Sequence, residues 1–213
     1  MTPAEALALV QRSEPWFQAC VGSIGASRVH DIIAKGRAGA PSASRENLLA
    51  QIVVERLTGR SASNPFKTPA MDRGIELEAE ARREYTFMTG NEVREVGMYL
   101  HPTILGTHAS PDGIIGDDGL LEAKCPEAAE HKRMLLGGKI KAAYETQANW
   151  QLACSGRKWV DWVSFSPDWP ISMQLRKIRI HRDHAVIVEL EGEVRRFLAE
   201  VEEEVAKLKA AYP

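Results

Sequence analysis

The chain has few cysteines and no long apolar run. Its three cysteines among 213 residues, Cys20, Cys125 and Cys154, include no C-x-x-C pair. This argues against a zinc site and a disulfide scaffold, and it fits a reducing compartment. No apolar stretch approaches the length of a membrane span, and the first sixteen residues carry acids where a signal peptide is basic and apolar. We therefore expect a cytoplasmic protein with no membrane partner.

An excess of positive charge is also missing, since 27 lysines and arginines face 29 acids for a net charge of −2. Dedicated nucleic-acid-binding domains are usually basic. The distribution is uneven, because residues 28–45 and 132–141 are locally basic while residues 189–204 are strongly acidic. Such an arrangement either focuses DNA toward a groove or reflects solvated helix faces. No internal repeat, P-loop or nucleotide-binding glycine motif is present.

The length predicts one domain over residues 1–213 with a sizeable core. Thr2, Pro3 and Glu5 predict a helix start with a capping box, and that helix should continue to about residue 13. A polar loop is expected over residues 60–68. Hydrophobic periodicity predicts further helices over residues 44–57, 70–88, 127–136, 142–155 and 183–211, and strands over 92–100, 159–164 and 173–181.

The stretch from Thr107 to Pro126, THASPDGIIGDDGLLEAKCP, concentrates chemistry-bearing residues. Residues 116–119 are turn-forming and lie between two apolar runs, so residues 110–115 and 120–125 are predicted to form a β-hairpin. Asp112 then lies near the start of one strand. On the other strand, side chains alternate, so Glu122 and Lys124 share one face while residues 121 and 123 face the apolar side.

Two neighbouring carboxylates repel each other unless a cation lies between them, and oxygen ligands suit Mg²⁺ or Mn²⁺. A lysine beside that cation can orient or deprotonate a water molecule and offset phosphate charge. An isolated E-x-K pair is more often a solvated surface feature. Here the combined spacing of Asp112, Glu122 and Lys124 favours phosphodiester hydrolysis.

Ser110-Pro111-Asp112-Gly113, followed by Leu121-Glu122-Ala123-Lys124-Cys125-Pro126, resembles the PD-(D/E)xK nuclease signature. More narrowly it resembles the active-site block of the phage lambda-type alkaline exonucleases, the YqaJ-like viral recombinase family. The resemblance implies a restriction-endonuclease-like α/β fold, with a mixed central sheet flanked by helices. It also implies a Mg²⁺-dependent 5′ to 3′ exonuclease on double-stranded DNA ends, which releases mononucleotides and leaves 3′ tails. A homotrimeric ring and a single-strand annealing recombinase are the implied partners.

The resemblance extends to two predicted helices. GIELEAEARREYTFMTG is similar to the family's G-x-x-x-E-x-x-A-R helix, which implies that Glu78 is a direct or water-mediated ligand of a second metal ion. YETQANWQLACSG is similar to the helix bordering the active site, which implies that Gln147 contacts the attacking water or the scissile phosphate. Asp112, Glu122 and the Ala123 carbonyl would hold the first ion.

Candidate DNA contacts follow from the same resemblance. In GSIGASRVHDIIAKGRAG, Ser27 is predicted to cap a helix and, with Arg37, to bind phosphate; Ser110 is a further candidate. The chain departs from the family at two phosphate-binding arginine positions, where it has Cys20 and Glu130. Neighbouring basic residues are the candidates to substitute, namely Lys132 and Arg133. A dependence on a 5′-phosphate is therefore left open.

Two other functions stay open. A structure-specific or nicking endonuclease on the same fold would suit the departure at Cys20. A noncatalytic DNA-binding recombination module is disfavoured because Asp112, Glu122 and Lys124 are all retained. His101 and His108 are interpreted as structural, since no matching cysteine or histidine spacing accompanies them. The three tryptophans at 159, 162 and 169 suit a sheet core or subunit packing better than base stacking.

Overall fold

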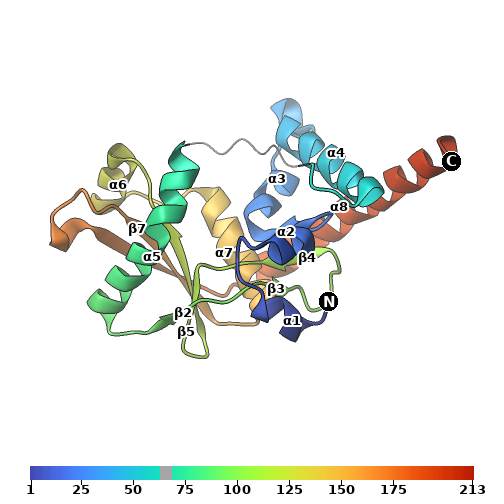
Figure 1. Cartoon of the computed structure of the whole chain (residues 1–213). Helices are drawn as coiled ribbons and strands as arrows, with labels where there is room; N and C mark the ends of the chain where they lie inside the picture. Colours follow the sequence, from blue (N-terminus) through green and yellow to red (C-terminus); the bar gives the residue numbers. More distant parts are fainter. Residues whose placement is uncertain (63–68) are drawn as a thin grey trace.

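The computed structural model describes residues 1–62 and 69–213, and within them a five-stranded sheet runs in the order β2-β5-β6-β7-β8 (Figure 1). The pairs β2–β5, β5–β6 and β7–β8 are antiparallel, whereas β6 and β7 are parallel. A parallel pair requires a long crossover, and here it contains α6 and α7. The strand bounds are β2 Val93–Arg94, β5 Gly113–Ile115, β6 Gly119–Lys124, β7 Trp159–Phe165 and β8 Leu175–His181.

Helices cover both faces of this sheet. On one face α5 packs against β6 and β8, and on the other α7 packs against β7 and β8. Along β6 the side chains alternate accordingly: Leu121 packs with Tyr85 of α5, whereas Leu120 packs with Leu152 of α7. The bounds of these helices are α5 Pro69–Thr89, α6 Ala128–Leu135 and α7 Ala142–Ser155.

A second layer joins the N-terminal helices to the long C-terminal helix α8, which extends away from the sheet in Figure 1. Its core includes Leu48 and Ile52 of α4, Trp150 of α7, and Val194 and Phe197 of α8. A small sheet, in the order β1-β4-β3, connects this layer to the strand that leads into Asp112. The remaining bounds are α1 Pro3–Ala8, α2 Glu14–Cys20, β1 Ile24–Gly25, η1 Ala26–Arg28, α3 Val29–Ile33, η2 Arg37–Gly39, α4 Ala43–Thr58, β3 Tyr99–Leu100, β4 Thr107–Ala109, η3 Ile171–Met173 and α8 His184–Ala211.

The predicted fold class, the hairpin and the helix over residues 142–155 are confirmed, as is the capping box at Thr2 and Glu5. The prediction that the first helix continues to about residue 13 is wrong. This helix ends at Ala8, and α2 begins at Glu14 because Ser13 accepts a hydrogen bond from the backbone of Trp16 and acts as a new N-cap.

Two further predictions are corrected. The strand over residues 92–100 is divided between two sheets, with Gly97 between the pieces, where a Cβ would lie 2.4 Å from the carbonyl oxygen of Ala6. Ser27 is not an N-cap, because it lies inside η1, whose cap position is Gly25. Of the predicted polar loop over 60–68, residues 63–68 lie outside the described part of the chain. No helix among the described residues has the length and apolar character to cross a bilayer.

Candidate active site

The β5–β6 pair brings the two predicted acids side by side. Gly113 pairs with Leu121 in the antiparallel ladder, so Asp112, one residue earlier, lies next to Glu122. Gly113 has no room for a side chain, because a Cβ there would lie 2.3 Å from Cγ1 of Val93. Glycine at this position lets β5 approach β2 closely, and this close pairing determines where Asp112 enters the site.

Glu122 is only 3% exposed, and three side-chain donors hold its carboxylate. Nζ of Lys124 lies 2.5 Å from Oε1, and Nε2 of Gln147 lies 2.6 Å from the same oxygen. Nε2 of Gln151 donates to the other oxygen, Oε2. A buried carboxylate needs such partners, because losing its hydration without them is costly. One side of β6 and one face of α7 therefore fix the orientation of Glu122.

Asp112 is half-buried, and its Oδ2 accepts a hydrogen bond from the backbone N–H of Ala123 at 2.7 Å. Burial and the nearby carboxylates of Glu122 and Glu78 raise the pKa of Asp112 well above its usual value. For Lys124, burial lowers the pKa, but the carboxylates of Glu122 and Asp112 outweigh it and raise the pKa above the usual value. The three acids and the ammonium thus form one electrostatically coupled group.

Glu78 reaches this group from α5. It contributes to the raised pKa of Asp112, so its charge is felt at the acid pair. Both of its carboxylate oxygens accept hydrogen bonds from Nη2 of Arg12, at 2.6 and 2.5 Å. Arg12 lies in the turn between α1 and α2, and no local sequence pattern predicts this contact, because the two residues are 66 positions apart.

A pocket of about 200 Å³ opens beside these residues. Five residues predicted from the sequence line it: Ser27, Ser110, Asp112, Glu122 and Gln147. The remaining lining residues were not predicted, namely Gln11, Arg12, Trp16, Gly25, Ala26 and His108. Gln151 was also missed as a site residue, although its spacing of four from Gln147 on one helix was a usable signal.

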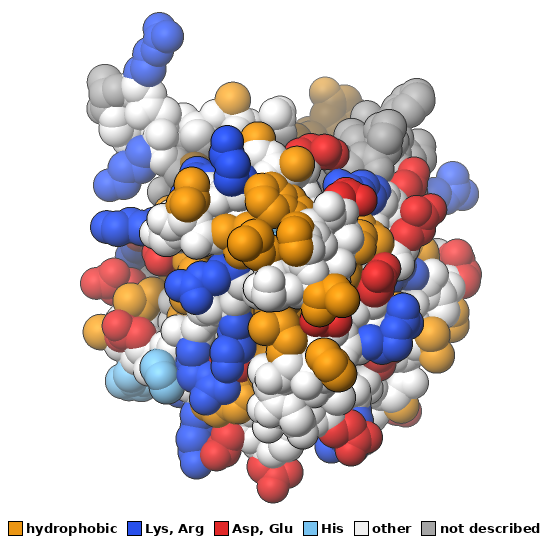
Figure 2. Space-filling model, turned by 90° about the vertical axis from the view of Figure 1, so that its left-hand side faces the viewer, with side chains coloured by type: hydrophobic (Ala, Val, Ile, Leu, Met, Phe, Trp, Pro, Cys, Tyr) orange, Lys and Arg blue, Asp and Glu red, His pale blue; other side chains and the backbone are white. Residues whose placement is uncertain are grey.

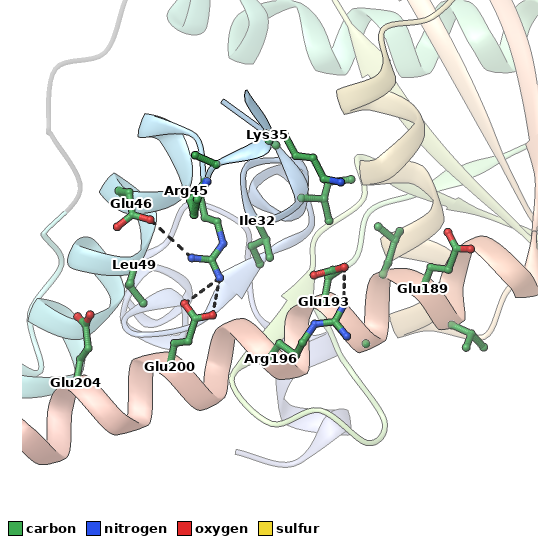
Figure 3. Close-up of a pocket in the computed structure, with 18 residues that line it drawn as sticks. Ile32, Lys35, Arg45, Glu46, Leu49, Glu189, Glu193, Arg196, Glu200 and Glu204 are labelled. Carbon is green, nitrogen blue, oxygen red and sulfur yellow. Dashed lines mark hydrogen bonds and ion pairs between the residues drawn. The ribbon is translucent and has the colours of Figure 1, made fainter. Parts of the chain in front are cut away.

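A larger pocket of about 880 Å³ lies between the α3–α4 region and α8 (Figure 3). Arg45 on α4 is hydrogen-bonded there to both carboxylate oxygens of Glu200 on α8, at 2.8 Å each. Its charged lining is predominantly acidic, with Glu46, Glu189, Glu193, Glu200 and Glu204 against Lys35, Arg45 and Arg196. Neither Asp112 nor Glu122 lines this larger pocket, whereas both line the smaller one, so the smaller pocket is the candidate site for a nucleic acid.

The predicted basic DNA contacts lie apart from the small pocket. Arg37, Lys132 and Arg133 are exposed and are not among the residues that line it. Arg133 instead makes two hydrogen bonds of 2.9 Å to Glu130. Figure 2 shows the face that includes α6 and the β7–β8 connection, where hydrophobic side chains gather beside lysines and arginines. The exposed apolar residues of these segments include Leu136, Ile171 and Met173.

Cys20 and Glu130 supply no positive charge to the site. Burial and the Glu55 carboxylate raise the pKa of Cys20 to about 12, so it remains a neutral thiol. Arg133, together with Lys141, holds the pKa of Glu130 down at about 2. His108 is buried, which lowers its pKa to about 4, and Nδ1 lies 2.8 Å from Oγ of Ser23. His101 accepts backbone hydrogen bonds from residues 103 and 104 at Nδ1.

The donor atoms suit a hard divalent cation, although no group of three or more His, Cys, Asp or Glu side chains within residues 1–62 and 69–213 is arranged to hold one. Carboxylates and carbonyls are the ligands that Mg²⁺ and Mn²⁺ prefer, usually with several waters retained. The acids of the site raise the pKa of Asp112, a repulsion that a cation would offset. Oε1 of Gln151 is buried and has no hydrogen-bond partner among the described residues, so it is available to accept a hydrogen bond from a ligand of the site.

The mixed sheet, with Glu122 and Lys124 on β6 and Asp112 directly before β5, defines a nuclease fold of the PD-(D/E)xK class. Within that class, the chain belongs to the YqaJ-like viral recombinase family, whose domain matches residues 15–158. Among curated proteins no match is found.

The solved structures that are similar to the chain include three of exonucleases. An alkaline exonuclease from Laribacter hongkongensis is 46% identical, with a TM-score of 0.86 over 93% of this chain and 97% of that one. The same exonuclease in complex with dAMP is 45% identical, with the same score and coverage. A phage-related exonuclease from Haemophilus somnus has a TM-score of 0.66 at 14% identity, over 87% of this chain and 96% of that one, and supports the fold alone.

Proposed function

We propose that the protein is a metal-dependent exonuclease that digests double-stranded DNA from its ends. The observation that carries this proposal is the convergence of Asp112, Glu122 and Lys124 beside one pocket. The 46% identity to an alkaline exonuclease over nearly the whole chain supports it. The larger, acidic pocket offers no comparable chemistry for a phosphodiester.

Asp112, Glu122 and the Ala123 carbonyl would hold one Mg²⁺, for which Mn²⁺ could substitute, and Glu78 would assist with a second ion. When bound, the ions make a coordinated water more acidic and offset charge on the phosphate. Their ligands come from three places, namely the strand pair, the β6 backbone and α5. The proposal therefore requires both the β5–β6 register and the position of α5.

The protein's own residues have distinct roles in this proposal. Lys124 orients or deprotonates the attacking water from its place beside Glu122. Gln147 contacts that water or the scissile phosphate, and it supports by hydrogen bonding because an amide has no useful pKa for proton transfer. Gln151 keeps Glu122 in one orientation. Ser27 and Ser110 contact DNA at the pocket wall, with Arg37, Lys132 and Arg133 contacting the backbone farther out.

Several finer features belong to the same proposal. Digestion runs 5′ to 3′, releases nucleoside monophosphates and leaves 3′ single-stranded tails for a strand-annealing recombinase. The ability of the Laribacter exonuclease to bind dAMP is consistent with a nucleoside monophosphate as the product. The protein acts in the cytoplasm as a homotrimeric ring that encloses DNA.

One labelled linear duplex tests the activity and its direction. We expect Mg²⁺-dependent release of labelled mononucleotide when the label is at the 5′ end, and none in EDTA. Early release of a 3′-terminal label would contradict the proposed polarity, and an inert protein at saturating Mg²⁺ would contradict the nuclease itself. Chemical crosslinking and light scattering would test the trimer independently.

A structure-specific or nicking endonuclease is the second candidate. It is favoured by the neutral thiol of Cys20 and by Glu130, which is already paired with Arg133, since neither can bind a terminal phosphate. A covalently closed plasmid distinguishes the two activities. An exonuclease leaves this substrate intact, whereas an endonuclease converts it to nicked or linear DNA.

A further inference from the structure

One face of α7 contacts both charged side chains of β6. Gln147 and Gln151 donate to the two carboxylate oxygens of Glu122. Tyr144 comes one helical turn before Gln147 on the same side of α7, and Nζ of Lys124 lies over its ring, 5.1 Å from the ring centre. The helix therefore meets the carboxylate with two amides and the ammonium with an aromatic ring.

The ammonium of Lys124 needs a second restraint. Its one hydrogen bond among the described residues goes to Oε1 of Glu122 at 2.5 Å, and the lysine side chain is 26% exposed. An ammonium on a flexible four-carbon stem can pivot about a single acceptor while water competes for its other donors. The face of an aromatic ring attracts a cation and shifts its equilibrium position by about 2- to 30-fold. The ring of Tyr144 therefore confines the ammonium beside the carboxylate.

The ring of Tyr144 is itself held in place. It is half-buried and packs against Trp162 of β7, with 5.7 Å between the ring centres and 30° between the ring planes. Trp162 is only 2% exposed, so it is a fixed support. The hydroxyl of Tyr144 makes no hydrogen bond within the described ranges, unlike that of Tyr85, which donates to Asp161. What Tyr144 supplies is thus the face of its ring.

A second ammonium, that of Lys141, also lies over this ring, 5.8 Å from its centre. The side chain of Lys141 is 57% exposed, and its Nζ lies 3.4 Å from a carboxylate oxygen of Glu130. Exposed cation–aromatic contacts are weaker than contacts from which water is excluded. Lys124, with its smaller exposure, is therefore the lysine whose position depends on the ring.

We propose that Tyr144 is a positioning residue for Lys124, whose ammonium its ring holds in the place from which it acts on the attacking water. The inference rests on the proposed nuclease function. A group that orients a reactant contributes to the rate only while it occupies the productive position. Removing the ring should lower the occupancy of that position. Tyr144 does not line the small pocket, so binding of DNA should not depend on it.

Tyr144→Leu removes the aromatic ring and keeps an apolar side chain against Trp162. The single-turnover rate of nucleotide release should fall by about 3- to 30-fold. Affinity for a linear duplex, measured with Ca²⁺ in place of Mg²⁺, should stay within about twofold because no phosphate contact is lost. Tyr144→Phe keeps the ring and should restore most of the lost rate. Tyr212→Leu is the matched control, because Tyr212 is 79% exposed at the end of α8.

A measurement without DNA or metal follows the ammonium itself. Reductive methylation of the protein in EDTA, quantified at each lysine by mass spectrometry, reports how open each ammonium is to the reagent. Methylation of Lys124 should be about 2- to 30-fold faster in Tyr144→Leu than in the natural chain, and Tyr144→Phe should match the natural chain. Lys158, which is 71% exposed, should react equally in all three proteins.

A double-mutant cycle distinguishes positioning of Lys124 from a general structural role. If Tyr144 acts through Lys124, then Tyr144→Leu should slow cleavage no further, within about twofold, once Lys124→Ala is present. A structural role would slow cleavage equally with and without the lysine. Equal slowing in both backgrounds, or unchanged methylation of Lys124 in Tyr144→Leu, would overturn the proposal.

The two readouts also separate this inference from the nuclease function. If the natural chain releases nucleotide with Mg²⁺ while Tyr144→Leu alters neither the rate nor the methylation of Lys124, the nuclease stands and the positioning role fails. If the ring protects Lys124 from methylation but the natural chain releases no nucleotide, the placement of the ammonium stands and the nuclease fails.

Discussion

Replacing Lys124 by alanine should separate DNA binding from cleavage. The change removes the ammonium that lies 2.5 Å from Oε1 of Glu122 and 5.1 Å from the centre of the Tyr144 ring. A positioned acid–base or water-orienting group contributes about 10²- to 10⁴-fold to a rate, so the single-turnover rate should fall by that factor. Binding of linear duplex should stay within about threefold, because Lys124 does not line the pocket that receives DNA in this proposal.

Lys124→Ala should also lower the stability of the fold, and this loss should depend on whether a divalent ion is present. Breaking a buried ion pair costs about 3–5 kcal/mol, but Gln147 and Gln151 still donate to Glu122 and Lys124 is 26% exposed. We therefore expect the free energy of unfolding of Lys124→Ala to be lower by about 1–3 kcal/mol without divalent ions. At about 2–4 °C per kcal/mol, the melting temperature should fall by about 2–12 °C. Mg²⁺ should restore much of it, since the freed carboxylate gains a cation.

The assays are thermal melts in EDTA and in Mg²⁺, together with single-turnover release of a 5′-terminal label. Lys158→Ala is the matched control, because its Nζ lies 2.9 Å from Asp118 but the two side chains are 71% and 49% exposed. Exposed pairs contribute about 0–1 kcal/mol, so this variant should behave like the natural chain. Undiminished cleavage by Lys124→Ala would remove Lys124 from the mechanism.

Three further predictions concern stability. Asp112→Asn should raise the melting temperature in EDTA, since burial and nearby carboxylates raise the pKa of Asp112; the gain should shrink as the pH falls toward about 4, where an unfolded aspartate is also protonated. Thermal melts should show that this gain in melting temperature disappears when Mg²⁺ is added. A nuclease assay on the same variant should show that nucleotide release is lost. Burial raises the pKa of Asp161, but hydrogen bonds from Arg179 and Tyr85 outweigh it, so its net shift is downward and the stability it contributes at neutral pH is lost in acid. Asp161→Asn should cost about 2–4 kcal/mol at pH 7 by denaturant unfolding, and the difference should narrow below pH 4. Tyr85→Phe, which loses the 2.7 Å bond to Asp161, should cost about 1–3 kcal/mol and leave the cleavage rate unchanged, and a slowed rate would contradict this.

Local patterns predicted the central part of the fold well. The turn glycines and strict alternation determined the β5–β6 pair, and Leu120 and Leu121 do face opposite helices. Helix α7 has the predicted bounds, and Gly156, which adopts the left-handed conformation at its C-cap, signals its end. These features depend on neighbours within a few residues, which is what a sequence pattern encodes.

The parts that could not be predicted depend on contacts between distant segments. Arg12 meets Glu78 across 66 positions, and Gln11 meets Pro111 across 100. The first helix ends at Ala8 because the following turn is held by those contacts. The sequence of residues 3–13 therefore predicts a longer helix than the one that forms. Likewise, Gly97 divides a strand-like stretch because α1 packs against it. No local pattern carries such information.

The parallel pairing of β6 with β7 also has a consequence for motion. Because these neighbouring strands are connected through α6 and α7, the residues that hold Glu122 are all contributed by a single continuous excursion of the chain. We expect amide hydrogens of β6 and α7 to exchange with solvent together, as one cooperative unit. Thermal fluctuations that loosen the crossover would then break the contacts of Glu122 with Lys124 and Gln147 in the same event.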